Sequence, residues 1–290
     1  MTGVLAGRRA IVTGGNRGLG LEIARGFVAA GADIAIGARD EALLSTEVGR
    51  LANVRPDGRV IGRKLDVASE TDCHAFVEWA IAELGYIDVL VNNAAIHGPI
   101  GPLELVDWTN WVEAIEINLL GSVMMARAIL GHMKSRRRGA IIQLSGGGAT
   151  NPLPSISAYA ASKAAVVRFA ETLALEVKDY GIDVNSIAPG ALNTRLLDEV
   201  LAAGPEKVGK DYHDRALGWK KSGGVPLDKG ADLAVFLASD AARGITGRLI
   251  SAVWDKWDEW PEHLDELSGS DLYTLRRIAG RDRGQSWGDR

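Results

Sequence analysis

A glycine-rich turn near the N-terminus constrains the fold of this chain most strongly. Residues 9–12 read as a short buried strand, and the sequence TGGNRGLG follows at residues 13–20. Apolar side chains at positions 19, 23, 27 and 28 then recur at the spacing of a helix. Because glycines allow a tight turn and a close approach of the backbone, this strand, turn and helix form the context of a dinucleotide-binding fingerprint. The N-terminus of the helix would favour the negative charge of a pyrophosphate.

Strand and helix patterns alternate along the chain without an intervening linker. Such alternation builds a parallel sheet with helices on both faces. We therefore expect an α/β fold, a Rossmann-type doubly wound parallel sheet, in a single domain that spans residues 1–253. The expected strands cover residues 9–12, 33–37, 60–65, 88–92, 139–145, 182–187 and 248–253, and the expected helices cover residues 18–30, 40–52, 70–84, 108–133, 157–179 and 228–239.

Composition and charge exclude several classes of protein. The chain has 290 residues, of which 47% are hydrophobic and 24% are charged, as in an ordinary globular domain. Its net charge of −4 creates no global basic field for nucleic acid, and the basic run at residues 134–138 is expected to complement the dipole at a helix C-terminus. Cys73 is the only cysteine, which excludes an intrachain disulfide, and the five histidines lack a metal-binding spacing.

Targeting signals are not expected. The N-terminal residues contain no apolar segment of the kind that a signal peptide needs, and no run of 18 apolar residues predicts a membrane-spanning helix. We therefore expect a cytoplasmic protein that uses no metal ion and binds neither nucleic acid nor a membrane.

Tyr159 and Lys163 form a candidate catalytic pair. They are four residues apart, so they share one face of the helix expected at 157–179. A cation held against a phenol favours the anionic form and lowers the phenol pKa from its ordinary value of about 10. Such a phenol could exchange a proton with a substrate oxygen near neutral pH. The same spacing also occurs in surface pairs without a function, so the pair alone leaves both interpretations open.

The TGxxxGxG spacing of the turn, joined to this YxxxK pair, resembles the short-chain dehydrogenase/reductase family in its compact, non-extended branch. The resemblance covers residues 5–253 and includes an NNAG-like motif with Ala95 in place of glycine, and a PGxxxT segment at residues 189–194. It implies that the cofactor is bound by Gly14, Asn16, Arg17, Gly18, Leu19, Gly20, Asp66, Val67, Asn92, Ala94, Tyr159, Lys163, Pro189, Gly190, Leu192 and Thr194.

The same resemblance implies a reaction. Hydride would pass between a nicotinamide and an alcohol or carbonyl carbon, while Tyr159 donates or removes the proton. Lys163 would lower the Tyr159 pKa, and Asn118 would hold a water that connects Lys163 to solvent.

The catalytic serine of the family is displaced in this chain. The family places it thirteen residues before the tyrosine, where this chain has Gly146. Ser145 comes one residue early, and alternation along a strand would turn it to the opposite face. Either the following glycines re-aim Ser145, which is our candidate, or another donor such as Ser155 or Ser157 serves the substrate oxygen. A hydroxyl aimed at a developing oxyanion contributes about 2.7–4 kcal/mol.

The end of the second strand indicates which dinucleotide is bound. Enzymes that use NAD place an acid there for the ribose 2′-hydroxyl, whereas an arginine accommodates a 2′-phosphate. Here Ala38 takes the acidic position and Arg39 follows it, with Arg17 of the turn as a second candidate charge. The sequence therefore predicts NADP, with NAD as the alternative because Asp40 comes next.

Two segments lie outside the cofactor motifs. In the resembling family, residues matching 193–225 form a mobile substrate lid. Residues 254–290 are an extension with Trp254, Trp257 and Trp260 spaced three apart, and its last residues, 280–290, look polar and frayed. Because tryptophan is enriched at interfaces and in ligand pockets, the extension is either an arm that stabilises an oligomer, which we favour, or a cap over an active site. The resemblance implies a homodimer or homotetramer built through the helices at 108–133 and 157–179.

The sequence thus predicts an oxidoreductase that transfers a hydride between NADP(H) and an alcohol or carbonyl group of a small molecule. An acyl-thioester ketone, a sugar or polyol, and a cyclic alcohol remain open as substrates. The alternative is a non-catalytic dinucleotide-binding or sensor protein on the same fold, which Gly146 motivates.

Overall fold

Seven parallel strands form one sheet within residues 3–287, the range that the computed structural model describes. Residues 1–2 of the expected domain and residues 288–290 of the expected extension lie outside that range. The strand order is β3-β2-β1-β4-β5-β6-β7, the doubly wound arrangement that the alternating pattern predicted. The strands are β1 (Arg9–Thr13), β2 (Asp33–Ala38), β3 (Val60–Lys64), β4 (Val89–Asn92), β5 (Gly139–Leu144), β6 (Ile182–Ala188) and β7 (Leu249–Ser251).

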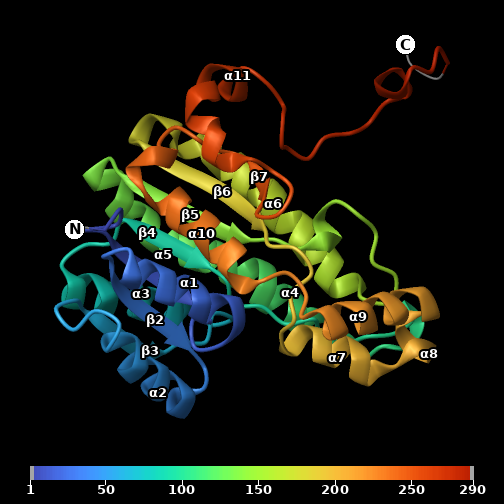
Figure 1. Cartoon of the computed structure of the whole chain (residues 1–290), viewed down its shortest axis with the longest axis horizontal. Coiled ribbons are helices and arrows are strands. Elements are labelled where there is room, and N and C mark those ends of the chain that lie inside the picture. The colour runs from blue at the N-terminus through green and yellow to red at the C-terminus, as the bar shows by residue number, and fades with distance from the viewer. Residues whose placement is uncertain (1–2, 288–290) are drawn as a thin grey trace.

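Helices cover both faces of the sheet (Figure 1). One face carries α1 (Gly18–Ala29), α2 (Glu41–Ala52) and α10 (Leu227–Ala238). The other face carries α3 (Glu70–Leu84), α5 (Gly121–Arg136) and α6 (Ser157–Val177).

The strands supply both hydrophobic cores by alternation. In β1, Ala10 and Val12 join the core beneath α1 and α10, whereas Ile11 joins the core beneath α3 and α5. Because both faces are covered, the central strands need apolar residues at every position, which explains their continuous apolar sequence.

The helix expected at 108–133 contains one turn of π-helix, which we call the π turn. α4 (Trp108–Ile115) continues through the π turn Glu116–Leu120 into α5. The combined stretch Trp108–Arg136 is long and apolar enough, by length and composition, to cross a membrane, and its most apolar 18-residue window has a mean hydropathy of 1.4. In the fold, 44% of its most apolar window is buried, and α5 packs on the sheet and on α3, as a core helix does.

Residues 193–225, which we call the lid segment, form a group of helices at one side of the molecule (Figure 1). They are α7 (Arg195–Ala203), α8 (Pro205–Val208) and α9 (Lys210–Ser222). Leu192 forms bridges with Gly224 and Val225, so the two ends of the segment lie side by side. The segment therefore leaves the body of the protein after Leu192 and returns beside the same residue at Gly224 and Val225.

The first part of the C-terminal extension packs on its own chain. The buried guanidinium of Arg248 donates to the carbonyls of Ser270 (3.1 Å) and Leu272 (2.6 Å), and the Leu249 N–H donates to the Tyr273 carbonyl (2.8 Å). The extension thereby covers the edge of β7, which would otherwise expose unpaired backbone groups.

Tryptophans of the extension anchor it to the core beneath α10. Trp260 is 5% exposed, and its ring lies 4.3 Å from that of Tyr273. Trp257 lies 5.0 Å from Phe236 of α10. The extension also contains α11 (Leu264–Ser268), and beyond this helix the last described part of the chain runs away from the body of the molecule (Figure 1).

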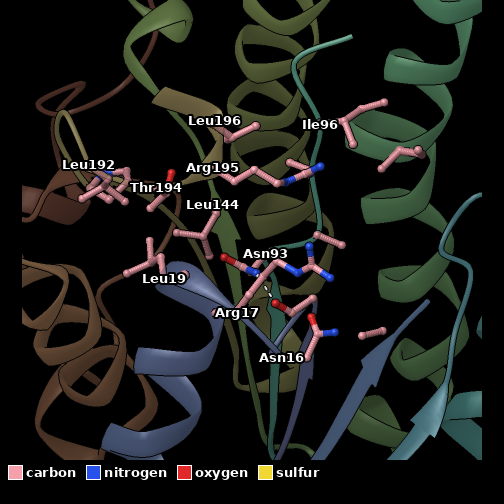
Figure 2. A pocket seen from close by; sticks show the side chains of 18 of the residues that line it. Asn16, Arg17, Leu19, Asn93, Ile96, Leu144, Leu192, Thr194, Arg195 and Leu196 are labelled. Carbon is pink, nitrogen blue, oxygen red and sulfur yellow. Dashed lines mark hydrogen bonds between the residues drawn. The ribbon is translucent and has the colours of Figure 1, made fainter. Parts of the chain in front are cut away.

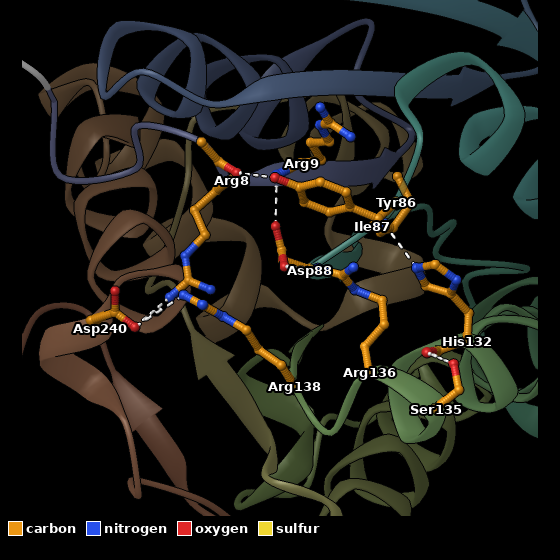
Figure 3. Close-up of polar contacts among 11 residues, drawn as sticks. Arg8, Arg9, Tyr86, Ile87, Asp88, His132, Ser135, Arg136, Arg138 and Asp240 are labelled. Atoms are coloured by element: carbon orange, nitrogen blue, oxygen red, sulfur yellow. Dashed lines mark hydrogen bonds and ion pairs between the residues drawn. The ribbon is translucent and has the colours of Figure 1, made fainter.

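The basic run at residues 134–138 makes contacts within its own chain. The Arg136 guanidinium lies 4.1 Å from the centre of the Tyr86 ring, and Arg138 lies 3.2 Å from Asp240 (Figure 3). These contacts fit the expected role of the run as a helix end.

Candidate active site

The glycine-rich turn connects β1 to α1 in a conformation that needs glycine. Gly14 has φ +64° and Gly18 has φ +54°, in the left-handed region that side chains disfavour. At Gly20, an added Cβ would lie 2.3 Å from the amide nitrogen of Asn93 and 2.4 Å from the Gly14 carbonyl oxygen. Only glycine therefore permits this close contact between the turn and the loop that follows β4.

Thr13 and Asn93 lock these two loops together. Thr13 Oγ1 accepts the backbone N–H groups of Asn93 (3.0 Å) and Ala94 (3.1 Å). The Asn93 side chain donates to the carbonyls of Thr13 (3.0 Å) and Gly14 (3.2 Å). Asn93 was not assigned from the sequence, although its place beside Asn92 at the end of a strand was a signal for it.

One cavity of about 790 Å³ brings most of the expected site residues together. Side chains from the turn, such as Arg17, and from the lid segment, such as Arg195, point into the same space (Figure 2). The expected residues that line it are Gly14, Asn16, Arg17, Gly18, Leu19, Gly20, Arg39, Asp66, Val67, Ala94, Ser145, Tyr159, Lys163, Pro189, Leu192 and Thr194. Lining residues that were not assigned from the sequence include Asn93, Ile96, Ile117, Leu144, Asn193, Arg195, Asp198 and Lys220.

Asn92 and Gly190 do not line the cavity, so their assignment to the cofactor site stays a prediction. Asn92 is buried, and its amide donates to the Ser122 carbonyl at 3.0 Å, because alternation along β4 turns it toward α5. Gly190 has φ +89°, and an added Cβ would lie 2.9 Å from Val225. Its role is a tight turn at the base of the lid segment.

Asn118 clamps the loop after β4 from within the π turn. Its Oδ1 accepts the Ile96 N–H (2.9 Å), while Nδ2 donates to the Ile96 carbonyl (2.8 Å) and to Ser162 Oγ (3.0 Å). The side chain is 1% exposed, and both the amide nitrogen and oxygen have partners in the chain. The side chain thus positions backbone at the cavity wall, and the expected relay water at Asn118 stays a prediction.

Tyr159 and Lys163 lie side by side on α6, and Lys163 is buried. The Lys163 ammonium donates to the Leu144 carbonyl at 2.6 Å and lies 5.7 Å from the centre of the Tyr159 ring. Burial lowers the pKa of Lys163 from 10.5 to about 8 and, with a smaller effect of Tyr212, raises the pKa of Tyr159 from 10.0 to about 12. The expected lowering of the Tyr159 pKa by Lys163 was wrong for this state of the chain, because loss of solvation dominates over the nearby charge.

Ser145 is the one of the three candidate serines that lines the cavity. It is 3% exposed, its N–H donates to the Ile187 carbonyl at 2.8 Å, and its hydroxyl has no partner among the described residues. Ser157 Oγ instead accepts the Trp111 indole N–H at 3.1 Å. A buried hydroxyl without a partner is costly unless a ligand uses it, which favours Ser145 as a ligand contact.

Gly146 lies directly against the tyrosine. A Cβ added at Gly146 would lie 2.5 Å from the Tyr159 hydroxyl oxygen. The glycine that replaces the expected serine therefore leaves room for the phenol in its present position.

Two arginines border the other end of the cavity. Arg17 lies 3.1 Å from Asp40, whose other oxygen accepts the Leu43 N–H at 3.1 Å and caps α2. Arg39 lies 3.8 Å from Glu113, and both side chains are about half exposed. Arg17 and the N-terminus of α2 thus already balance the negative charge of Asp40.

The cavity fits a nicotinamide dinucleotide. It extends from the turn at the N-terminus of α1, beside Arg17, to Tyr159 and Lys163. The helix N-terminus and the open glycine backbone suit a pyrophosphate. Among residues 3–287, no group of three or more His, Cys, Asp or Glu side chains is arranged to hold a metal ion.

Comparison with known proteins supports this assignment. The model of the short chain dehydrogenase family matches residues 8–203. L-fucose dehydrogenase from Oryctolagus cuniculus is 37% identical over 82% of this chain and 81% of its own length. 3beta-hydroxysteroid dehydrogenase 1 from Eggerthella lenta is 35% identical over 84% of this chain and 91% of its own length.

A solved structure shares both the fold and much of the sequence. The crystal structure of a gluconate 5-dehydrogenase from Burkholderia cenocepacia, in complex with NADP and tartrate, has a TM-score of 0.74 and is 32% identical. The similarity covers 85% of this chain and 94% of that protein.

The C-terminal extension does not contribute to the cavity, since none of residues 254–287 lines it.

Lys163→Met should raise the free energy of unfolding at pH 7. The folded chain holds the amine pKa at about 8, below its ordinary value of 10.5, so stability rises with pH between these values and is lost as pH falls through 8. At pH 7 the folded chain carries the cost of burying the ammonium, which is at most about 3 kcal/mol. Urea unfolding should show a gain of about 1–3 kcal/mol for the variant, because methionine removes this cost.

Lys178→Met, at an exposed lysine, is the control and should change the stability little. A Lys163→Met variant that is less stable than the parent at pH 7, or that keeps the parent's rise in stability above pH 8, would contradict the lowered pKa of buried Lys163.

Proposed function

The chain belongs to the short-chain dehydrogenase/reductase family, and on that premise we propose that it transfers a hydride between NADP(H) and an alcohol or carbonyl group, with Tyr159 as the proton donor or acceptor. The observation that carries the proposal is the single cavity that the glycine-rich turn, Tyr159 and Lys163 line together. Two relatives with dehydrogenase names, one for a sugar and one for a steroid, support the reaction class.

The chain positions the reactants and moves the proton. A bound nicotinamide dinucleotide supplies or accepts the hydride. The backbone of the glycine-rich turn would hold its pyrophosphate, Asp66 and Val67 its adenine, and the segment from Pro189 to Thr194 its nicotinamide end.

Tyr159 is prepared for proton donation. With a pKa of about 12, the phenol is protonated at neutral pH and can donate to a carbonyl oxygen as negative charge develops there. Lys163, one helical turn away, is still mainly protonated at pH 7, since its pKa is about 8. Its charge would stabilise the phenolate that remains after donation. Ser145, with its unpartnered hydroxyl in the cavity wall, would donate to the same substrate oxygen.

NADP is the proposed dinucleotide. Arg17 and Arg39 both line the cavity, and a guanidinium fork suits a 2′-phosphate. Asp40 would oppose this phosphate only weakly, because Arg17 and the N-terminus of α2 balance its charge. The NADP complex of the gluconate 5-dehydrogenase is in line with this choice.

Tyr159→Phe should lower kcat by roughly 10²- to 10⁴-fold, because it removes the proton donor and little else. Calorimetric binding of NADPH and the unfolding temperature should match those of the parent. A variant that keeps its activity would remove Tyr159 from the role, and a parent that binds NADPH but reduces no carbonyl compound would favour the non-catalytic sensor.

Gly146→Ala should lower kcat/KM by about tenfold or more, because the new methyl group would displace the Tyr159 hydroxyl from its position. Gly147→Ala is the matched control, since a Cβ there would meet nothing within 4 Å. Equal kinetics for the two variants would show that the packing of residue 146 against Tyr159 does not matter for turnover.

Arg39→Ala should raise KM for NADPH by about tenfold or more and leave KM for NADH unchanged, because only NADPH carries the 2′-phosphate. Arg50→Ala, at an exposed arginine on α2 outside the cavity, serves as the control. A parent protein that prefers NADH would overturn the choice of dinucleotide.

A further inference from the structure

The lid segment presents two chemically different surfaces. Toward the cofactor cavity it contributes polar side chains, among them Asn193, Asp198 and Lys220. On the other side it forms an apolar cluster with the body of the protein, and Tyr159 belongs to that cluster. Tyr159 therefore lies between the polar cavity and the apolar cluster.

The apolar cluster is built from the three lid helices, the segment at the start of α6 and the loop after β4. Leu197 and Val200 of α7, Val208 of α8 and Ala216 of α9 are buried in it, together with Ile156, the residue before α6. The partly buried side chains packed against these residues include Ile100, Leu153, Tyr212 and Trp219, together with Tyr159. Ile100 follows β4 and Leu153 follows β5, so the cluster lies at the carboxyl edge of the sheet, where ligands bind in this fold.

Aromatic rings add flat apolar surfaces to the cluster. Tyr212 and Trp219 meet edge to face, with their ring centres 6.0 Å apart. On another side of the tyrosine, the His97 ring lies edge to face with Tyr159 at 5.0 Å. Such rings offer contact area to a hydrocarbon skeleton and few hydrogen bonds.

The acidic groups near this cluster are paired within the chain. Glu199 lies 3.3 Å from His97 and 3.2 Å from Arg195, and Lys220 lies 2.7 Å from Asp198. Arg215 lies 5.5 Å from the centre of the Tyr212 ring, so its charge faces an aromatic surface of the cluster.

We propose that the substrate is a secondary alcohol or ketone on an apolar ring, held between Tyr159 and the apolar cluster, and not a sugar or polyol. The inference rests on the proposed hydride transfer and names its substrate class. A substrate oxygen that reaches Tyr159 brings the rest of the molecule among the cluster side chains, in place of contacts that the lid now makes. An apolar ring compensates for those contacts, whereas the hydroxyl groups of a polyol would be buried without partners.

The step balances with the dinucleotide of the proposed function. In the oxidative direction Tyr159 first releases its own proton to solvent. The carbinol carbon then loses a hydride to NADP⁺, and the hydroxyl proton passes to the Tyr159 phenolate. The products are a ketone, NADPH and a proton.

The test compares alcohols that share one six-membered carbon ring. The full-length protein is assayed with NADP⁺ and cyclohexanol, 4-tert-butylcyclohexanol or myo-inositol. Since each buried methylene contributes roughly a fourfold factor, the tert-butyl group should raise kcat/KM by about tenfold or more over cyclohexanol. Myo-inositol should be at least about a hundredfold poorer than cyclohexanol. Oxidation of myo-inositol as efficient as that of cyclohexanol would overturn the proposal.

Binding separates this inference from the proposed function. Calorimetric titration of the NADP⁺-loaded protein should show tighter binding of 4-tert-butylcyclohexanol than of myo-inositol, whether or not either is oxidised. Oxidation of none of the alcohols would count against hydride transfer alone, and tighter binding of myo-inositol would count against the apolar substrate alone.

A matched pair of variants tests the cluster itself. Ile100 and Leu103 lie on the same loop after β4, but Ile100 packs on the cluster and Leu103 is 60% exposed. Ile100→Asn should lower the preference for 4-tert-butylcyclohexanol over myo-inositol by about tenfold, and Leu103→Asn should leave it unchanged. An unchanged preference in a folded Ile100→Asn variant would remove the cluster from substrate recognition, and the alcohol series with the parent protein decides the substrate class if that variant does not fold.

Discussion

The sheet reverses its strand order between β1 and β4, and the whole site depends on this reversal. The chain proceeds outward from β1 to β2 and β3 on one side, and from β4 to β5, β6 and β7 on the other. The loops that leave β1 and β4 therefore diverge and open a crevice at the carboxyl edge of the sheet. Thr13 and Asn93 hold the two loops in register through hydrogen bonds of 3.0 Å, which fixes the glycine-rich turn opposite the residues that follow β4 and β5.

The sequence was sufficient to predict the elements whose pattern is local. Apolar runs and helical spacing gave the parallel sheet and its covering helices, because a strand that is buried on both faces must be apolar throughout. The turn at residues 13–20 and the pair Tyr159 and Lys163 carry strict spacing, and these residues indeed line one cavity. Gly146 was also identified from the sequence by its distance from Tyr159, and the structure explains it by the close approach of the phenol.

Features that depend on three-dimensional packing could not be predicted in this way. The extent to which Lys163 and Tyr159 lose solvent depends on the lid, so the direction of the Tyr159 pKa shift was misjudged. The hydrogen bonds of Asn118 depend on a π turn that has no local signature in the sequence. The apolar cluster around the tyrosine joins segments more than fifty residues apart, namely Ile100, Leu153 and α9.

The account rests on the claim that the cavity presents one face of a nicotinamide ring to a carbonyl carbon beside Tyr159. Transfer of deuterium from NADPH labelled at C4 to 4-tert-butylcyclohexanone tests this claim most directly. We predict that deuterium reaches the carbinol carbon of the product from only one of the two C4 positions, because a fixed cavity exposes a single face of the ring. Absence of deuterium from the product, or equal transfer from both positions, would contradict the account.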